Sequence, residues 1–221
     1  MAETLRVNQD GERRFFAAMA VLFVATALIG FGPNSVAILN GTKTNPPLII
    51  HLHAAAMASW LALLLAQSVL IANGNRRLHR KLGMVSVVLA PVMVAIMFVL
   101  AFPLPEGREH VNAIAVIQVK RITLFSLFFT WAFLSRKSDT AAHRRLMFLA
   151  TLVVLDAAFN RMKFLPTFGY ENLIAVRHAW ELVLLVPIAA YDIMTTGRLH
   201  RVNVIGIPLI IAFSIVASLL W

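Results

Sequence analysis

Long apolar stretches, separated by short polar connectors, follow one another along the whole chain. Seven of them approach the length of about 20 residues that a helix needs to cross the hydrocarbon core of a bilayer. They lie at residues 15–38, 48–72, 83–103, 112–134, 144–164, 174–195 and 203–221. No alternation of apolar and polar residues typical of barrel strands is present. The pattern predicts an all-α polytopic transmembrane bundle of about seven helices, forming a single domain over residues 1–221.

The composition agrees with this pattern. Hydrophobic residues make up 60% of the chain and charged residues only 14%, whereas soluble domains carry about 25% charged residues. The absence of cysteine excludes disulfides, thiolate metal sites and iron–sulfur clusters. The apolar run that begins at Phe15 is longer than a signal-peptide core and lacks a clear cleavage site. We therefore expect residues 1–14 to be a polar cytoplasmic N-terminus followed by a retained first helix.

The basic residues are distributed unequally between the two sets of connectors. With the N-terminus placed inside, the inner segments carry thirteen Lys and Arg residues and the outer loops carry two. Cytoplasmic loops of membrane proteins are enriched in these residues. The sequence thus predicts the N-terminus inside and the C-terminus outside. This topology also explains most of the net charge of +10 without nucleic acid as a partner.

Several charged and polar residues fall inside the predicted membrane helices. A charged side chain at mid-bilayer costs about 2.5–3.5 kcal/mol even on lenient scales, so such residues normally face the bundle interior and pair there. On the predicted topology they lie between mid-bilayer and the outer surface, above apolar inner halves such as residues 146–155. The sequence predicts a polar chamber that opens outward over an apolar floor.

The charges expected in this chamber do not cancel. Lys163 and four candidate anion-binding residues outnumber Asp156 and Glu181 by five to two. The four candidates are Lys120, Arg121, Arg161 and Arg177. Since an excess of positive charge in low dielectric is costly, we expect an anionic ligand: a carboxylate substrate, a lipid headgroup or haem propionates. The alternative is that some cations reach outward to water and the others form structural ion pairs.

Pairing inside the chamber follows from helical spacing and depth. Asp156, Asn160 and Lys163 would lie on one stripe of a continuous helix, and Glu181 could contact either Arg177 or His178. Because they share the depth of Asp156, Lys120 or Arg121 is expected to pair with it.

Four histidines suggest a cofactor. His53 and His178 share an outer depth, whereas His79 and His143 share an inner one, which is the layout of two stacked haem b groups with two histidine ligands each. His79 and His143 begin similar His-Arg phrases at helix starts, and a third phrase begins at His200. The phrases are alternatively interfacial anchors, or the trace of a repeated helical hairpin.

Two further functions remain open. His53, His178, Glu181 and Asp156 would form a nitrogen and oxygen ligand set for zinc or iron in a membrane-embedded enzyme acting on a lipid or anionic substrate. His53, His178 and Glu181 are then expected to converge, with Arg161 and Arg177 at the rim. A small organic-anion transporter suits the basic chamber, although two inverted halves with broken helices are not evident.

Five short motifs in residues 51–161 resemble a family. They are His51-x-His53, Gln67, His79-Arg80-x-Leu82-Gly83, His143-Arg144-Arg145-Leu146-Met147 and Asn160-Arg161. They look like a group of bacterial polytopic membrane proteins catalogued only as a predicted membrane family of unknown function. The resemblance covers about half of the chain and implies a multi-pass protein of the bacterial inner membrane, but no reaction. The histidine layout is also similar to that of di-haem b-type cytochromes, although here the histidines lie near helix ends. The pattern is compatible with a homo-oligomer.

Overall fold

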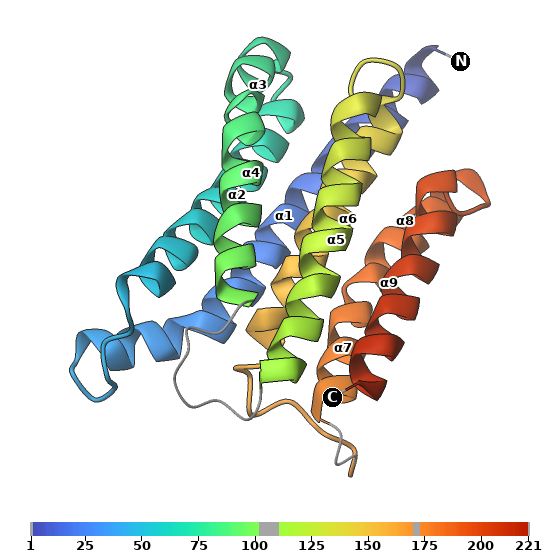
Figure 1. Cartoon of the computed structure of the whole chain (residues 1–221). Coiled ribbons are helices and arrows are strands. Elements are labelled where there is room, and N and C mark those ends of the chain that lie inside the picture. Colours follow the sequence, from blue (N-terminus) through green and yellow to red (C-terminus); the bar gives the residue numbers. More distant parts are fainter. Residues whose placement is uncertain (1, 102–110, 170–172, 221) are drawn as a thin grey trace. The chain divides into compact units, whose positions relative to one another are not determined.

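The computed structural model describes residues 2–101, 111–169 and 173–220, and their side chains except at residues 2–9 and 111–114. Every regular element in these ranges is a helix, and they contain no strand. The helices are α1 (Ala2–Leu39), α2 (Leu48–Ala72), α3 (Arg76–Gly83), α4 (Val85–Ala101), α5 (Val111–Ser135), α6 (Thr140–Phe159), α7 (Leu173–Val183), α8 (Leu185–Thr196) and α9 (Arg201–Leu219) (Figure 1). The all-α prediction is confirmed.

Six helical segments of the described chain are long and apolar enough to cross a membrane. They are Asp10–Leu39, Leu48–Ala72, Arg76–Ala101, Ala115–Ser135, Leu173–Thr196 and Arg201–Leu219. The protein is therefore a multi-pass membrane protein. Helix α6 is long enough as well, with 20 residues, but it contains Arg144, Arg145 and Asp156.

Two of the seven predicted helices, residues 15–38 and 144–164, have different limits in the structure, where they correspond to α1 and α6. Helix α1 begins at Ala2 rather than at residue 15, and an ion pair between Asp10 and Arg13, three residues apart, supports its polar part. Helix α6 ends at Phe159 rather than at residue 164. The chain then forms tight turns before Pro166, which disfavours helical backbone at the residue that precedes it. The predicted stripe from Asp156 to Lys163 is therefore wrong.

The predicted helix at residues 174–195 is interrupted at Leu184, between α7 and α8. Pro187 has no N–H to donate to the carbonyl of Val183, four residues earlier. The N–H of Leu184 instead donates to the carbonyl of Glu181, three residues earlier. A similar tight turn at Met84 separates α3 from α4. The predicted helix ends at residues 103 and 221 lie outside the described residues.

The chain divides into two compact units, Met1–Ile96 and Met97–Trp221. In the first, α1 packs against α2 and α2 packs against α3. In the second, α5 and α6 form a close hairpin, and α9 packs against α5, α6 and α7. The single domain over residues 1–221 stays a prediction.

Helix α6 is the centre of the second unit. Its buried residues include Leu146, Leu149 and Leu152, which are 0% exposed. Helix α9 comes close to it at Gly206, where an added Cβ would lie 2.5 Å from the Cδ1 of Leu149. Glycine at this position therefore permits the tight packing of α9 on α6.

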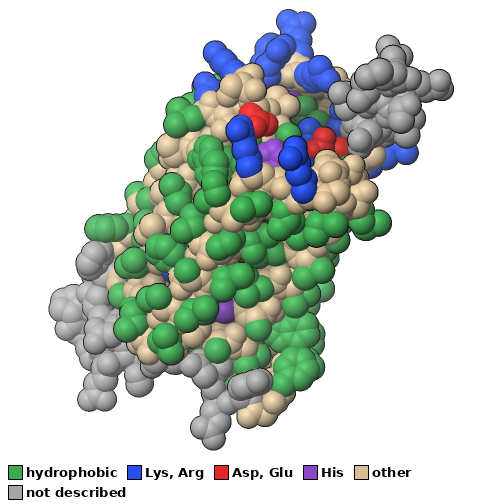
Figure 2. Space-filling model, turned by 90° about the vertical axis from the view of Figure 1, so that its right-hand side faces the viewer, with side chains coloured by type: hydrophobic (Ala, Val, Ile, Leu, Met, Phe, Trp, Pro, Cys, Tyr) green, Lys and Arg blue, Asp and Glu red, His purple; other side chains and the backbone are tan. Residues whose placement is uncertain are grey.

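The surface of the protein fits a bilayer environment. On the face shown in Figure 2, hydrophobic side chains are spread over the middle of the surface, and Lys and Arg side chains gather at the upper end. The turns that join α5 to α6 and α8 to α9 lie at the same end of the second unit (Figure 1), and Arg201 pairs there with Asp139 at 2.6 Å. An apolar surface with basic residues at one end is typical of helices that span a membrane.

Candidate functional site

Five ionisable residues meet inside the second unit, and we call them the carboxylate cluster. Lys120 and Arg121 come from α5, Asp156 from α6, and His178 and Glu181 from α7. Lys120 and Arg121 lie in the first half of α5, and Asp156 lies in the last turn of α6. His178 lies at the middle of α7, and Glu181 lies in its last turn. The antiparallel α5–α6 hairpin brings Lys120 and Arg121 close to Asp156. The side chains of Lys120, Asp156 and Glu181 are at most 4% exposed.

Ion pairs connect the cluster. The Nζ of Lys120 lies 2.6 Å from Oε2 of Glu181 and 3.7 Å from Oδ2 of Asp156. The Nε of Arg121 donates to Oδ1 of Asp156 at 2.7 Å, and its Nη1 donates to Gln118 at 2.9 Å. The prediction that Asp156 pairs with Lys120 or Arg121 is confirmed for both. Glu181, however, pairs with Lys120 rather than with Arg177 on its own helix.

The charge balance differs from the expected excess of three positive charges. Two carboxylates face two cations in the cluster, because Arg161 and Lys163 are exposed and follow the end of α6. Arg161 donates to the carbonyl of Ala157 at 3.0 Å. Arg177 is only partly buried. Of the four candidate anion-binding residues, Lys120 and Arg121 are thus engaged by carboxylates, whereas Arg161 is exposed and Arg177 is half-buried.

The hydrogen bonds of His178 define which ring nitrogen carries the proton. Its Nδ1 lies 3.0 Å from Oγ of Ser218 on α9. The hydroxyl of Ser218 donates to the carbonyl of Ser214 at 2.8 Å. Since that hydroxyl proton is already used, Nδ1 of His178 is the donor to Ser218. In the neutral imidazole this leaves the lone pair on Nε2.

Three side chains of the cluster have the arrangement of a metal-ion site. Asp156, His178 and Glu181 are buried, and each offers one ligand atom within 4.8 Å of the other two. Within the described residues, Oε1 of Glu181 is buried and has no hydrogen-bond partner. These are three of the four residues predicted to bind zinc or iron. The fourth, His53, lies on α2 in the other unit, so its convergence with His178 stays a prediction.

His79 and His143 occupy equivalent positions in two helical hairpins. Nδ1 of His79 on α3 lies 3.4 Å from the carbonyl of Gln67 on α2. Nδ1 of His143 on α6 lies 2.9 Å from the carbonyl of Ala132 on α5. In both hairpins, the imidazole on the second helix contacts a backbone carbonyl of the first helix. The shared geometry favours the repeated-hairpin explanation of these two His-Arg phrases. The two residues belong to separate units.

The third phrase has a different role. The Nδ1 of His200 accepts the N–H of Val202 at 3.3 Å and caps the start of α9. Burial lowers the pKa of His200 from its usual value. Nearby Asp139 caps α6, and the N–H of Ala142, together with Arg201, holds the pKa of Asp139 below its usual value.

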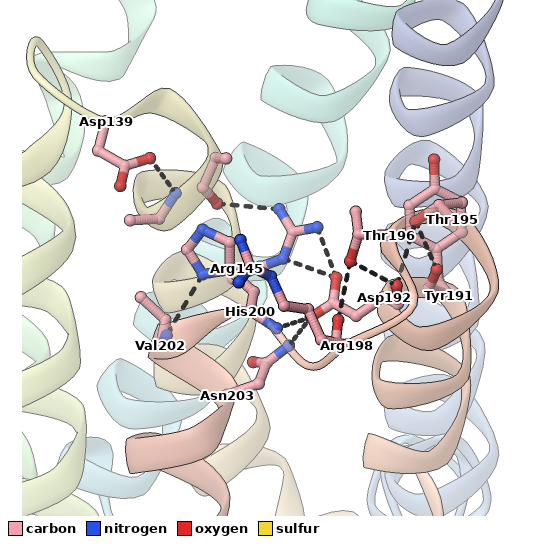
Figure 3. Close-up of polar contacts among 12 residues, drawn as sticks. Asp139, Arg145, Tyr191, Asp192, Thr195, Thr196, Arg198, His200, Val202 and Asn203 are labelled. Carbon is pink, nitrogen blue, oxygen red and sulfur yellow. Dashed lines mark hydrogen bonds and ion pairs between the residues drawn. The ribbon is translucent and has the colours of Figure 1, made fainter.

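A second buried cluster was not predicted, and we call it the Asp192 cluster (Figure 3). Oδ1 of Asp192 on α8 accepts from Nε and Nη2 of Arg145 on α6 at 2.9 and 2.5 Å. Its Oδ2 accepts from the N–H of His200 at 3.0 Å and from Nδ2 of Asn203 at 2.7 Å. Arg145, Asp192 and Asn203 are at most 3% exposed.

A signal for this cluster exists in the sequence. Glu181 and Asp192 are the only two acidic residues in the apolar stretch 174–195, and a carboxylate in such a stretch needs a partner. Arg145 belongs to the His-Arg phrase at the same predicted inner surface, so the two residues share a depth. That shared depth is the signal for the pair.

A scan against protein-family models found no matching family, and searches of the curated proteins and of the solved structures found no match.

Proposed function

We propose that this protein binds a divalent transition-metal ion within the membrane, through Asp156, His178 and Glu181. The observation that carries the proposal is the gathering of three buried ligand atoms within 4.8 Å of one another. One imidazole nitrogen and two carboxylate oxygens form a set that suits zinc or ferrous iron. The unpartnered Oε1 of Glu181 is a further acceptor that a cation would satisfy.

The surroundings of the ligands support this proposal. Residues that bind metals are usually oriented by hydrogen bonds to their other polar atoms. Ser218 holds Nδ1 of His178, and Arg121 holds Oδ1 of Asp156. Each contact leaves a second polar atom of the ligand residue for the ion.

Lys120 acts as the competing cation in this proposal. Its ammonium lies 2.6 Å from Glu181 and, with Arg121, balances the two carboxylates. Adding a divalent ion to an intact cluster would create a buried charge of +2, which a low-dielectric interior disfavours. Metal binding therefore requires Lys120 to withdraw from Glu181 or to lose its proton.

Metal titration of the purified protein tests the site. After chelator treatment, we expect the protein in detergent to bind about one equivalent of zinc, measured by elemental analysis and calorimetry. His178→Gln should abolish binding. Lys120→Met should raise the affinity by about tenfold or more, because a competing charge is removed. His51→Gln, on an exposed histidine, is the matched control and should bind as the wild type does. Equal binding by the His178 variant, or none by the wild type and the Lys120 variant, contradicts the proposal.

Haem b is a second candidate function. The Nδ1 contacts of His79 and His143 with backbone carbonyls are of the kind that orients histidine ligands. The visible spectrum of the same sample distinguishes the two functions, since a Soret band that shifts on reduction supports haem. A small organic-anion transporter stays a prediction, although two carboxylates face two cations in the carboxylate cluster.

The topology is also a proposal. We place the N-terminus inside and the C-terminus outside, in the inner membrane of a bacterium, with α6 as a seventh span whose charges are paired within the bundle. The bias of basic residues supports this orientation. A reporter that is active only in the periplasm should be active when fused to the C-terminus. An active cytoplasmic reporter at that position contradicts the proposed orientation.

A further inference from the structure

Helix α3 carries a concentrated positive charge. Four of its eight residues are basic, namely Arg76, Arg77, Arg80 and Lys81. All four are exposed. They form two adjacent pairs, 76–77 and 80–81, that are one helical turn apart, so all four lie along one side of the helix. The sequence contains no acidic residue between positions 13 and 105, so no acidic side chain within that stretch neutralises them.

The position of α3 along the chain indicates the depth at which this charge lies. It follows the polar turn at Asn73 and Gly74 and leads directly into α4, within the apolar span Arg76–Ala101. Leu78, on α3, is 45% exposed, and Met84, at its end, is 56% exposed. A basic helix with exposed apolar side chains at the end of a membrane span lies at the level of the lipid headgroups.

We propose that α3 is a binding site for anionic phospholipid headgroups. Arginine recognises phosphate through paired hydrogen bonds, and three arginines on one side of a short helix offer several such donors. Clusters of four or more basic residues next to a membrane span attract lipids with a net negative charge over zwitterionic ones. The occupant is therefore phosphatidylglycerol or a similar lipid. The proposal is independent of the metal site.

Lipid competition tests this inference. Purified protein is mixed with equimolar phosphatidylglycerol and phosphatidylcholine, and the bound lipids are counted by native mass spectrometry. We expect the wild type to prefer phosphatidylglycerol. Arg76→Gln with Arg77→Gln should reduce that preference by about tenfold or more. Arg77→Gln alone should give a smaller reduction in the same direction, which protects the test if the double variant folds poorly.

The matched control removes the same charge elsewhere. Lys137 and Arg198 are exposed, and they lie in the α5–α6 and α8–α9 turns of the other unit. Lys137→Gln with Arg198→Gln should leave most of the lipid preference intact. The inference is overturned if the two double variants lose the preference equally, or if the α3 variants keep it in full.

Discussion

Asp192→Ala is expected to destabilise the protein by about 3–5 kcal/mol, the usual cost of breaking a buried ion pair on one side. The substitution leaves the guanidinium of Arg145 buried without its carboxylate. It also removes the acceptor for the N–H of His200 and for the amide of Asn203. Thermal unfolding in detergent, followed by tryptophan fluorescence, should show the midpoint lowered by roughly 10 °C.

Two further variants show whether the loss of stability arises because the Arg145–Asp192 pair is buried. Arg201→Gln breaks the Asp139–Arg201 pair, in which the arginine is 73% exposed, so it should cost at most about 1 kcal/mol. Arg145→Met combined with Asp192→Leu removes both buried charges and should recover much of the loss, because a buried pair replaced by apolar residues is often tolerated. If Asp192→Ala costs no more than Arg201→Gln, the buried pair does not hold α6 and α8 together as described.

Lys120→Met is expected to destabilise the metal-free protein by a similar amount, but here zinc should restore part of the lost stability. It leaves Glu181 and Asp156 buried with only Arg121 as a cation, so the metal-free protein should lose about 3–5 kcal/mol. Zinc would then supply the missing positive charge. Adding zinc should therefore raise the unfolding midpoint of this variant more than that of the wild type.

The double variant Lys120→Met with Glu181→Met separates structure from binding. It removes one cation and one carboxylate, so the charges balance and much of the stability should return without metal. Zinc should no longer raise its unfolding midpoint, since a ligand has been removed. A zinc-induced rise as large as that of Lys120→Met would instead show that zinc acts elsewhere on the protein.

The helices were predictable because a bilayer demands long apolar stretches, but their ends depended on prolines. Pro187 removes one donor inside an otherwise regular apolar stretch, and hydropathy averages over it. Pro166 ends the helical backbone earlier than hydropathy indicates, so the predicted helix ran to residue 164, whereas α6 ends at Phe159. Both positions are visible in the sequence. They required attention to single backbone hydrogen bonds rather than to composition.

The ion pairs were predictable only where depth restricted the partners. Asp156 had two cations at its own depth on an adjacent helix, and both contact it. Glu181 had candidate partners on its own helix, yet it pairs with Lys120, which is 61 residues away. Choosing between local and distant partners requires knowledge of which helices pack together, and apolar stretches carry little of that information.

The two buried clusters have a consequence for the order in which the second unit assembles. Within them, the α5–α6 hairpin contributes Lys120, Arg121 and Arg145 against one carboxylate, Asp156. The segment α7–α8 contributes two carboxylates, Glu181 and Asp192. The hairpin made first thus carries two uncompensated cations, and the segment made next carries the two anions that neutralise them. During synthesis, a chain that ends after α6 would retain water or lipid phosphates around these cations, and the arrival of α7 and α8 would release them.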